Sequence, residues 1–396
     1  MKLSSIPVAL KYILKCRKIT KKPLQTDIVI FDKEGAVDFF DYFKKYTFSV
    51  FECRGESINL LVLIYAIYKY GRKVSMGTYA SCYIDLAKPL VVVTFIDNNK
   101  VFYGLKKFHP KVKFISVQNG YRDRCLFEML MHNINTKADL SADAIFCFSP
   151  AIGKYYDRVI SANIIPHGSF KNNKVAKNNR ISGLDEVVFL SQYRTPVIHN
   201  GLPTMPVGER NILWSDFYSS ELILLPRLLN FCNKHGIVLK VCGTSFNENN
   251  SEFKFFSDLL GDAGWEYWRK SEDLDNYKKI DQASTIVFID STLGYEALGR
   301  GLKCVAFPLR GGVLQVNDRR FGWPADLPES GSFWASKGDE CEVERLMNYI
   351  TKVSDDEWKL ISTPVVEQLM CFDAGNSRFI EFIDNVIVKQ GKHYAQ

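Results

Sequence analysis

Short apolar runs recur along the whole chain, and each is followed by a segment with helical periodicity. This alternation is typical of parallel sheets, because neighbouring parallel strands are joined through a crossover helix. We predict strands at residues 27–31, 47–53, 90–95, 113–117, 144–148, 163–165, 186–190, 237–242, 266–269, 285–290 and 303–307. We predict helices at about residues 35–45, 56–70, 98–108, 122–133, 150–160, 340–351, 355–370 and 375–389. The pattern predicts an α/β protein.

The chain has 396 residues, which exceeds the size at which one hydrophobic core stops growing. The alternation breaks near residue 170, where a polar stretch rich in Asn and Lys lacks apolar periodicity. We therefore predict a basic N-terminal segment and two Rossmann-like domains, at 1–23, 24–170 and 185–396, with a linker at 171–184. In such sheets ligands bind beyond the carboxyl ends of the strands, often at helix N-termini, so we expect the site in the cleft between the domains.

The basic N-terminal segment, residues 1–23, carries seven Lys or Arg and no acid, which equals the net charge of +7 of the whole chain. The neutral remainder argues against a nucleic-acid groove, which needs a basic stripe. Lys11 and Lys15 interrupt the apolar stretch, so it does not resemble a signal peptide. The segment either lies on an anionic membrane surface or is a solvated terminus. The ten scattered cysteines, with no Cys-x-x-Cys spacing, predict a cytoplasmic protein, soluble or peripheral to the inner face of the cytoplasmic membrane.

The stretch "FIDSTLGYEALGRGLKCVAFP" at 288–308 begins as a strand and changes abruptly to a helix. Ser291 and Thr292 are expected to cap this helix, whose free N–H groups and positive dipole end favour a phosphate. Gly294 has no Cβ to keep a phosphate away, and Glu296 follows one turn later, where its carboxylate can accept hydrogen bonds from ribose hydroxyls. The alternative is an ordinary helix cap.

Three further loops follow predicted strands of the second domain. Gln192 and Arg194 follow the first of these strands and are candidates for binding a phosphate. Arg310 follows the strand predicted at 303–307 and is a second candidate for the phosphate. Gly243 and Thr244 follow the second strand and are expected near the base or ribose.

The first domain supplies the candidate bases. Glu56, in the first turn of the helix predicted at 56–70, is the expected general base, although it can equally be a partner of the helix dipole. Asp123 is a second possible base, less favoured because it lies further into its predicted helix. His167, in "IPHGSF", closes the domain, and its alternative role is ordinary turn chemistry.

Other residues of the first domain are candidates for holding the substrate. Arg54, beside Glu56, is expected to bind a carboxylate or phosphate, because its guanidinium matches both. Gln118, Asn119 and Gly120 offer amide and backbone donors in "VQNGYRDR", and Arg122 adds charge. A plain strand-to-helix turn is the alternative.

The segment "DSTLGYEALGRGLKCVAFP" resembles the nucleotide-binding segment of GT-B glycosyltransferases, and the chain resembles bacterial surface-carbohydrate (capsule or lipopolysaccharide) biosynthesis transferases related to Kdo and nonulosonic acid transferases. Supporting stretches are "RGESINLLVL", "ISVQNGYRD", "IPHGSF", "GSFWAS" and "FDAGNSRF". The resemblance implies a GT-B-like fold, two Rossmann-like parallel-sheet domains facing across a cleft with C-terminal helices. It implies an inverting, metal-independent transferase that moves a sugar from a CMP- or UDP-linked nucleotide-sugar to a glycan or lipid-linked glycan acceptor. No cofactor and no nucleic-acid partner are expected.

Several motifs are missing from the sequence. It contains no P-loop, no Gly-x-Gly-x-x-Gly after a strand, no His-Glu-x-x-His and no Gly-x-Ser-x-Gly, and the stretch "FIDNN" at 95–99 has no Asp-x-Asp. With six scattered histidines, we predict no metal. Two alternatives stay open: a CDP-polyol phosphotransferase of the same fold, which would use a His base, and a non-catalytic subunit of glycan assembly.

Overall fold

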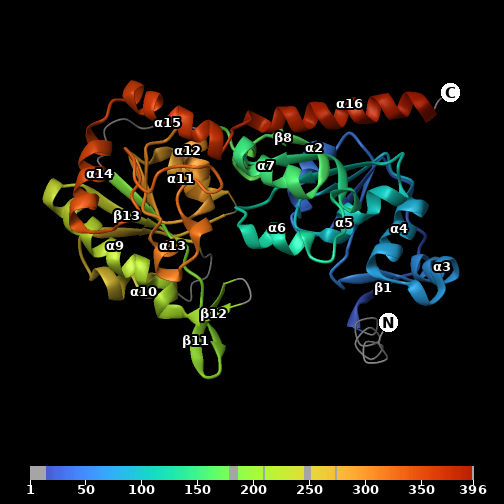
Figure 1. Cartoon of the computed structure of the whole chain (residues 1–396), viewed down its shortest axis with the longest axis horizontal. Coiled ribbons are helices and arrows are strands. Elements are labelled where there is room, and N and C mark those ends of the chain that lie inside the picture. Colours follow the sequence, from blue (N-terminus) through green and yellow to red (C-terminus); the bar gives the residue numbers. More distant parts are fainter. Residues whose placement is uncertain (1–14, 178–185, 208–209, 245–250, 273, 395–396) are drawn as a thin grey trace.

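The computed structural model describes residues 15–177, 186–207, 210–244, 251–272 and 274–394. They form two α/β halves, each built around a parallel sheet (Figure 1). The first sheet has the order β3-β2-β5-β6-β7-β8, with strands β2 Ile28–Phe31, β3 Phe48–Phe51, β5 Val91–Thr94, β6 Lys113–Val117, β7 Ser141–Cys147 and β8 Ser161–Pro166. The second has the order β14-β13-β9-β15-β16, with strands β9 Glu186–Leu190, β13 Val238–Cys242, β14 Trp265–Trp268, β15 Thr285–Phe288 and β16 Cys304–Ala306.

Helices cover both sheets. In the first half they are α2 Val37–Phe43, α3 Leu60–Tyr70, α4 Met76–Ala87, α5 Lys100–Leu105, α6 Arg124–Met131, α7 Pro150–Val159 and α8 Phe170–Lys174. In the second half they are α9 Trp214–His235, α10 Ser251–Leu260, α11 Asp275–Gln282, α12 Thr292–Gly299, α13 Leu309–Leu314, α14 Glu340–Lys352, α15 Asp355–Leu369 and α16 Ser377–Tyr394. Every residue of β2, β5 and β15 is buried, as expected for parallel strands covered on both faces.

Two small sheets were not predicted. β1 (Arg17–Ile19) pairs in parallel with β4 (Ser57–Asn59), so part of the basic N-terminal segment is folded onto the first half. β10 (Val197–His199), β11 (Leu202–Val207) and β12 (Arg210–Leu213) form an antiparallel sheet that projects from the second half. It lies at the bottom of Figure 1.

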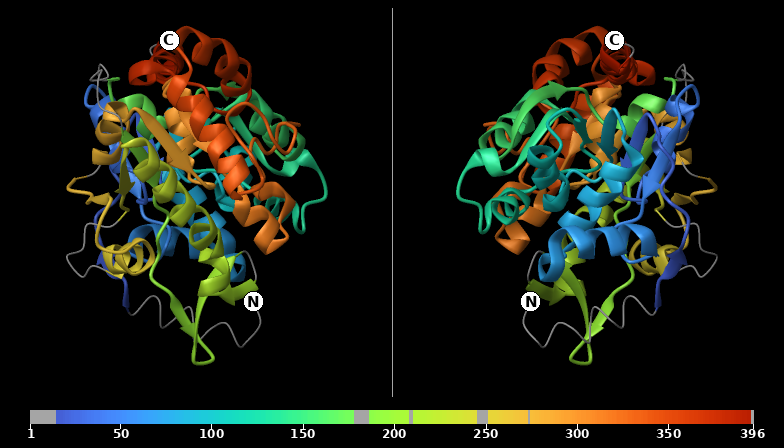
Figure 2. Two further views of the ribbon diagram at one scale, coloured as in Figure 1. Left: turned by 90° about the vertical axis from the view of Figure 1, so that its left-hand side faces the viewer. Right: turned by 90° about the vertical axis from the view of Figure 1, so that its right-hand side faces the viewer.

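The last helix, α16, returns to the first half of the molecule, as Figures 1 and 2 show. Its residues Phe379 and Ile383 are buried together with Phe39 and Phe146 against the first sheet. Apolar packing therefore ties the end of the chain to the N-terminal half, although the sequence pattern assigned this helix to the C-terminal domain. The first residues of the predicted linker form α8, whereas residues 178–185, like residues 1–14, lie outside the described part of the chain.

Among the described helices, none has the length and apolar character that crossing a membrane requires.

Candidate functional site

Two adjoining pockets lie between the two halves and share Asp123, Asp318 and Arg319. The smaller pocket, about 180 Å³, lies beyond the carboxyl ends of strands from both sheets. Its lining residues follow β6, β9 and β15 or come from the segment after α13: Tyr121, Asp123, Gln192, Arg194, Asp290, Thr292, Tyr295, Asp318, Arg319 and Arg320. This is where ligands bind in open α/β sheets.

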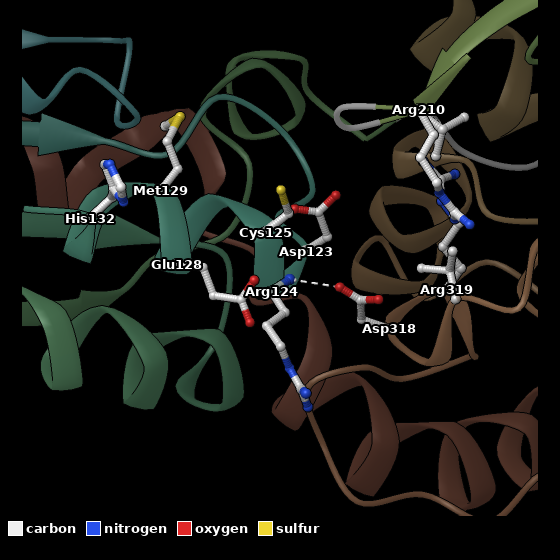
Figure 3. A pocket seen from close by; sticks show the side chains of 11 residues that line it. Asp123, Arg124, Cys125, Glu128, Met129, His132, Arg210, Asp318 and Arg319 are labelled. Carbon is white, nitrogen blue, oxygen red and sulfur yellow. Dashed lines mark hydrogen bonds between the residues drawn. The ribbon is translucent and has the colours of Figure 1, made fainter. Parts of the chain in front are cut away.

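The larger pocket, about 640 Å³, is shown in Figure 3. Side chains of α6 form one wall, and Arg210, Asp318 and Arg319 face them from the second half. The backbone N–H of Arg124 donates to Asp318 Oδ2 at 2.7 Å and so joins the two walls. A charged, open pocket of this size has room for a sugar or a glycan end beside the smaller pocket.

The smaller pocket contains the start of α12. Ser291 is the N-cap residue, as predicted, but its side chain makes no capping hydrogen bond. Thr292, the first helical residue, lines the pocket. The first turn of α12 therefore directs its dipole and N–H groups toward the pocket, and these groups suit a phosphate.

Packing requires a glycine at position 294, which the sequence did not reveal. A Cβ at this position would lie 2.2 Å from Cγ of the buried Phe288 ring, so the residue allows α12 to approach β15. A contact of Gly294 with phosphate stays a prediction.

We expect Gly294→Ala to lower the free energy of unfolding by about 1–3 kcal/mol, because the added methyl overpacks the core against Phe288. The matched control is Gly104→Ala in α5, where a Cβ would meet nothing within 4 Å. That variant should be unchanged or more stable by about 0.5–1 kcal/mol. Urea unfolding measures both, and equal stability of Gly294→Ala and the parent protein would contradict the packing assignment.

Glu296 is buried between the two halves and does not line either pocket. Its Oε1 accepts hydrogen bonds from Ser169 Oγ and, at 3.0 Å, from Tyr277 OH. Burial raises the pKa of Glu296 to about 7, and these two hydrogen bonds offset part of the rise. In this arrangement the carboxyl group joins the halves of the molecule, so a bond to ribose would require Ser169 and Tyr277 to release it.

The raised pKa predicts a pH-dependent contribution to stability. The folded state prefers the protonated carboxyl, so this contribution is complete below the unfolded pKa of about 4.5 and is lost as pH rises through 7. Glu296→Gln lacks the titration but keeps the acceptor oxygen. We expect the unfolding free energy of the variant, relative to the parent, to rise by about 2 kcal/mol from pH 5 to pH 8.

Urea unfolding at the two pH values measures this change. The pKa of Glu221 is also raised to about 7 by burial, but Glu221 is present in both proteins and its effect cancels. A pH-independent difference between variant and parent would contradict the assignment.

Arg194 lies in the smaller pocket, as predicted. Its backbone is fixed, because its N–H donates to Tyr218 OH at 2.6 Å and its carbonyl oxygen accepts from Trp214 Nε1 at 3.0 Å. Among the residues that the structure describes, no carboxylate pairs with its guanidinium. This cation is therefore available to an anionic ligand.

Arg310 is fully buried and serves a different purpose from the one predicted. Its guanidinium pairs with Glu221 and Asp290, donates to Gln192 Oε1 at 2.9 Å and to the Phe217 carbonyl at 3.2 Å, and stacks 4.2 Å from the Phe217 ring. It does not line either pocket. Arg310 instead positions Asp290 and Gln192, which line the smaller pocket.

Gly243 and Thr244 follow β13, as expected, but neither lines the two pockets. A Cβ at Gly243 would lie 2.2 Å from the Tyr267 hydroxyl. The N–H of Thr244 donates to both carboxylate oxygens of Glu252, at 3.0 and 3.1 Å. Their role near a base or ribose stays a prediction.

Asp123 is the candidate base that the structure brings to the site, because it lines both pockets. It is the N-cap of α6, and its Oδ1 accepts from the Leu126 N–H at 3.2 Å. The expectation that it lies inside the helix was wrong. The cap bond leaves its other oxygen available to a ligand.

Glu56 lies elsewhere. The predicted helix start at residue 56 was wrong: Glu56 precedes the strand β4, and α3 begins at Leu60. Its carboxylate accepts from the Arg54 N–H at 2.9 Å, and it lines neither pocket. The Arg54 side chain binds the buried Asp32 at 2.8 Å.

Residues 118–122 are held by buried partners. Gln118 joins the ends of β6 and β7, donating to the Gly120 carbonyl at 2.8 Å and accepting from the Phe148 N–H at 2.9 Å. Asn119 donates its N–H to Asp97 Oδ1 at 3.2 Å. The guanidinium of Arg122 pairs with the same Asp97, whose side chain is fully buried. These residues shape the turn that presents Tyr121 and Asp123. This agrees with the alternative prediction, a plain strand-to-helix turn.

His167 is fully buried, with Nε2 3.2 Å from Asp373 Oδ2. Burial raises the pKa of Asp373, but hydrogen bonds from His167, Ser377 and the Arg378 N–H outweigh it and leave the pKa below its usual value. The pair ties the segment before α16 to the end of β8. This burial keeps His167 away from both pockets.

Sequence reasoning missed several pocket residues. They are charged or polar side chains from both halves of the molecule: Tyr121, His132, Arg210, Asp290, Asp318, Arg319 and Arg320. One signal was available, the charge cluster "NDRR" at 317–320 shortly after a strand and a short helix.

A family model described as "putative O-antigen biosynthesis protein" matches residues 115–387, more than half of the chain. A structure of the wall teichoic acid polymerase TagF has a TM-score of 0.50 to this chain at 10% identity, covering 92% of this chain and 90% of that chain. A crystal structure of a UDP-N-acetylglucosamine 2-epimerase has a TM-score of 0.51 at 12% identity, covering 94% and 97%. No curated protein matches the sequence. These likenesses show a GT-B-like fold, which confirms the predicted fold class.

Proposed function

The chain belongs to this family of O-antigen biosynthesis proteins, and from this membership and its GT-B-like fold we propose that it is an inverting glycosyltransferase using a nucleotide-sugar donor. The observation that carries the proposal is the smaller pocket. There the unpaired Arg194 and the first turn of α12 lie beyond the carboxyl ends of β9 and β15, where a donor phosphate would bind.

In this proposal the larger pocket holds the acceptor glycan, and Asp123, which lines both pockets, is the general base. The carboxylate of Asp123 takes the proton of the attacking hydroxyl, whose oxygen then bonds to the anomeric carbon of the donor. The bond from that carbon to the phosphate oxygen breaks, and the nucleotide leaves with the electron pair. Arg194 and the α12 N-terminus stabilise its negative charge without requiring a metal ion.

The choice of donor nucleotide rests on the sequence resemblance. CMP-linked Kdo or nonulosonic acid is the donor implied by the sequence resemblance, and a UDP-linked sugar is the alternative. Arg124 and Arg210 in the larger pocket offer cations for a carboxylate on either substrate, whereas Arg319 is paired with Asp290.

A second candidate is phosphotransfer from a CDP-polyol, favoured by the likeness to TagF and by His132 in the larger pocket. His132 is exposed at the C-terminal end of α6, whereas the buried His167 lies against Asp373. For phosphotransfer, His132 is a more accessible base than His167.

Product analysis distinguishes these reactions. The full chain is incubated with CMP-, UDP- and CDP-linked donors that carry a labelled phosphorus next to the transferred group, with and without a lipid-linked glycan fraction. Glycosyl transfer leaves the label on the released nucleotide and requires the acceptor. Label entering the glycan would instead show phosphotransfer. Donor conversion without acceptor would show an epimerase-like reaction, and no turnover of any donor would favour the non-catalytic subunit.

A further inference from the structure

Helix α3 presents a row of apolar side chains to solvent. Leu61, Ile64 and Tyr68 are 43%, 62% and 87% exposed, and their spacing of three and four residues places them on one face. The opposite face is anchored in the core by Val62 and Ala66. A contiguous exposed apolar row on a well-anchored helix indicates an interaction surface.

Two stretches without any acid meet at this helix. Residues 15–26 contain five Lys or Arg, and residues 57–84 contain three, and neither stretch contains Asp or Glu. The parallel pairing of β1 with β4 brings them together, and Asn59 Nδ2 donates to the Lys21 carbonyl at 2.8 Å. The N-terminal end of α3 therefore lies beside a basic strand although some forty residues separate them in sequence.

Exposed cations mark both ends of the apolar row. Lys21 and Lys22 lie near the start of α3, and Arg72 and Lys73 follow its end. In the described ranges, no carboxylate forms an ion pair with any of these four. Two other basic residues of these stretches are already paired, Arg17 with Glu52 and Lys69 with Asp85.

We propose that α3 docks on the surface of an anionic lipid bilayer, with Leu61, Ile64 and Tyr68 at the boundary between headgroups and acyl chains and the four cations among the phosphates. An apolar row with unpaired cations at both ends is the pattern of an interfacial amphipathic helix, and Tyr is favoured at headgroup level. This docking does not depend on the proposed transferase reaction.

Co-sedimentation of the full chain with vesicles tests the proposal. The probes are vesicles of phosphatidylcholine alone and of phosphatidylcholine with phosphatidylglycerol. We expect binding to the anionic vesicles, weakened at least about tenfold by the triple variant Leu61→Ser, Ile64→Ser, Tyr68→Ser. Arg72→Gln and Lys73→Gln should each weaken it about fivefold. The matched control Leu360→Ser, on α15 and 76% exposed, should bind like the parent protein.

The proposal is overturned if the parent protein does not sediment with anionic vesicles, or if both the triple variant and the charge variants sediment like the parent. Thermal unfolding checks that the triple variant is folded, and the two charge variants, which change only exposed side chains, give an independent answer. Light scattering identifies the competing occupant: a dimer that the triple variant loses, without vesicle binding, would assign this face to a second copy of the chain.

Discussion

Replacing Arg310 with methionine is expected to lower the free energy of unfolding by about 3–5 kcal/mol. The guanidinium is fully buried and pairs with two carboxylates, Glu221 and Asp290; its loss leaves the charge of Glu221 uncompensated in the core, whereas Asp290 keeps its ion pair with Arg319. Methionine keeps much of the side-chain volume and limits the packing loss. Urea unfolding at pH 8 measures the effect.

Arg345→Met is the matched control, because Arg345 pairs with Glu342 on the exposed surface of α14 and should change stability by less than about 1 kcal/mol. The loss of unfolding free energy caused by Arg310→Met should also be smaller at pH 5 than at pH 8. Burial already raises the pKa of Glu221 to about 7, and without Arg310 this carboxyl group is protonated at pH 5 and carries no buried charge. If Arg310→Met lowers the free energy of unfolding by less than about 1 kcal/mol at pH 8, the ion pair of Arg310 with Glu221 does not contribute strongly to the stability of the core.

Replacing Asp123 with asparagine is expected to lower transfer by about 10²–10⁴-fold, because an amide cannot take the acceptor's proton. The fold should persist, since asparagine is an equally good N-cap and can still accept from the Leu126 N–H. Nucleotide affinity should be unchanged. The measurement is the rate of acceptor-dependent nucleotide release.

Glu56→Gln is the control for this prediction, because Glu56 lines neither pocket. It should turn over at the parent rate. The opposite result, with Glu56→Gln inactive and Asp123→Asn active, would return the base assignment to Glu56 and would require the cleft to close differently during the reaction.

The parallel sheets could be predicted because their strands are buried on both faces and so appear as uninterrupted apolar runs, as in Val91–Thr94 and Thr285–Phe288. The β10–β12 sheet was missed although Asn200 and Gly201, both with positive φ, form the two-residue turn typical of hairpins. Its strands are mostly exposed, so they lack the apolar signal. The pairing of β1 with β4 joins two three-residue strands, which are too short for any periodicity to be recognised.

The candidate site was only partly predictable. Thr292, Arg194 and Asp123 were found because each follows a strand and lies where helix or loop chemistry favours an anion or a base. Arg310 and Glu296 satisfy the same rule, yet the fold buries them between other elements, and burial depends on contacts such as Glu221 and Tyr277 that are distant in sequence. Asp318 and Arg319 lie in a three-residue 3₁₀ helix, Asn317–Arg319, which is too short for any periodicity to be recognised.

The central claim is that the smaller pocket binds the nucleotide of a donor. Calorimetric titration of the full chain with CMP, UDP, CDP and GDP tests it most directly, with Arg194→Ala as the site variant and Arg345→Ala as the surface control. We predict binding of one of these nucleotides, weakened about 10–100-fold in Arg194→Ala because a charge-assisted contact is lost, and unchanged in Arg345→Ala. Binding of none of the four, or equal binding by Arg194→Ala and the parent protein, would contradict the account.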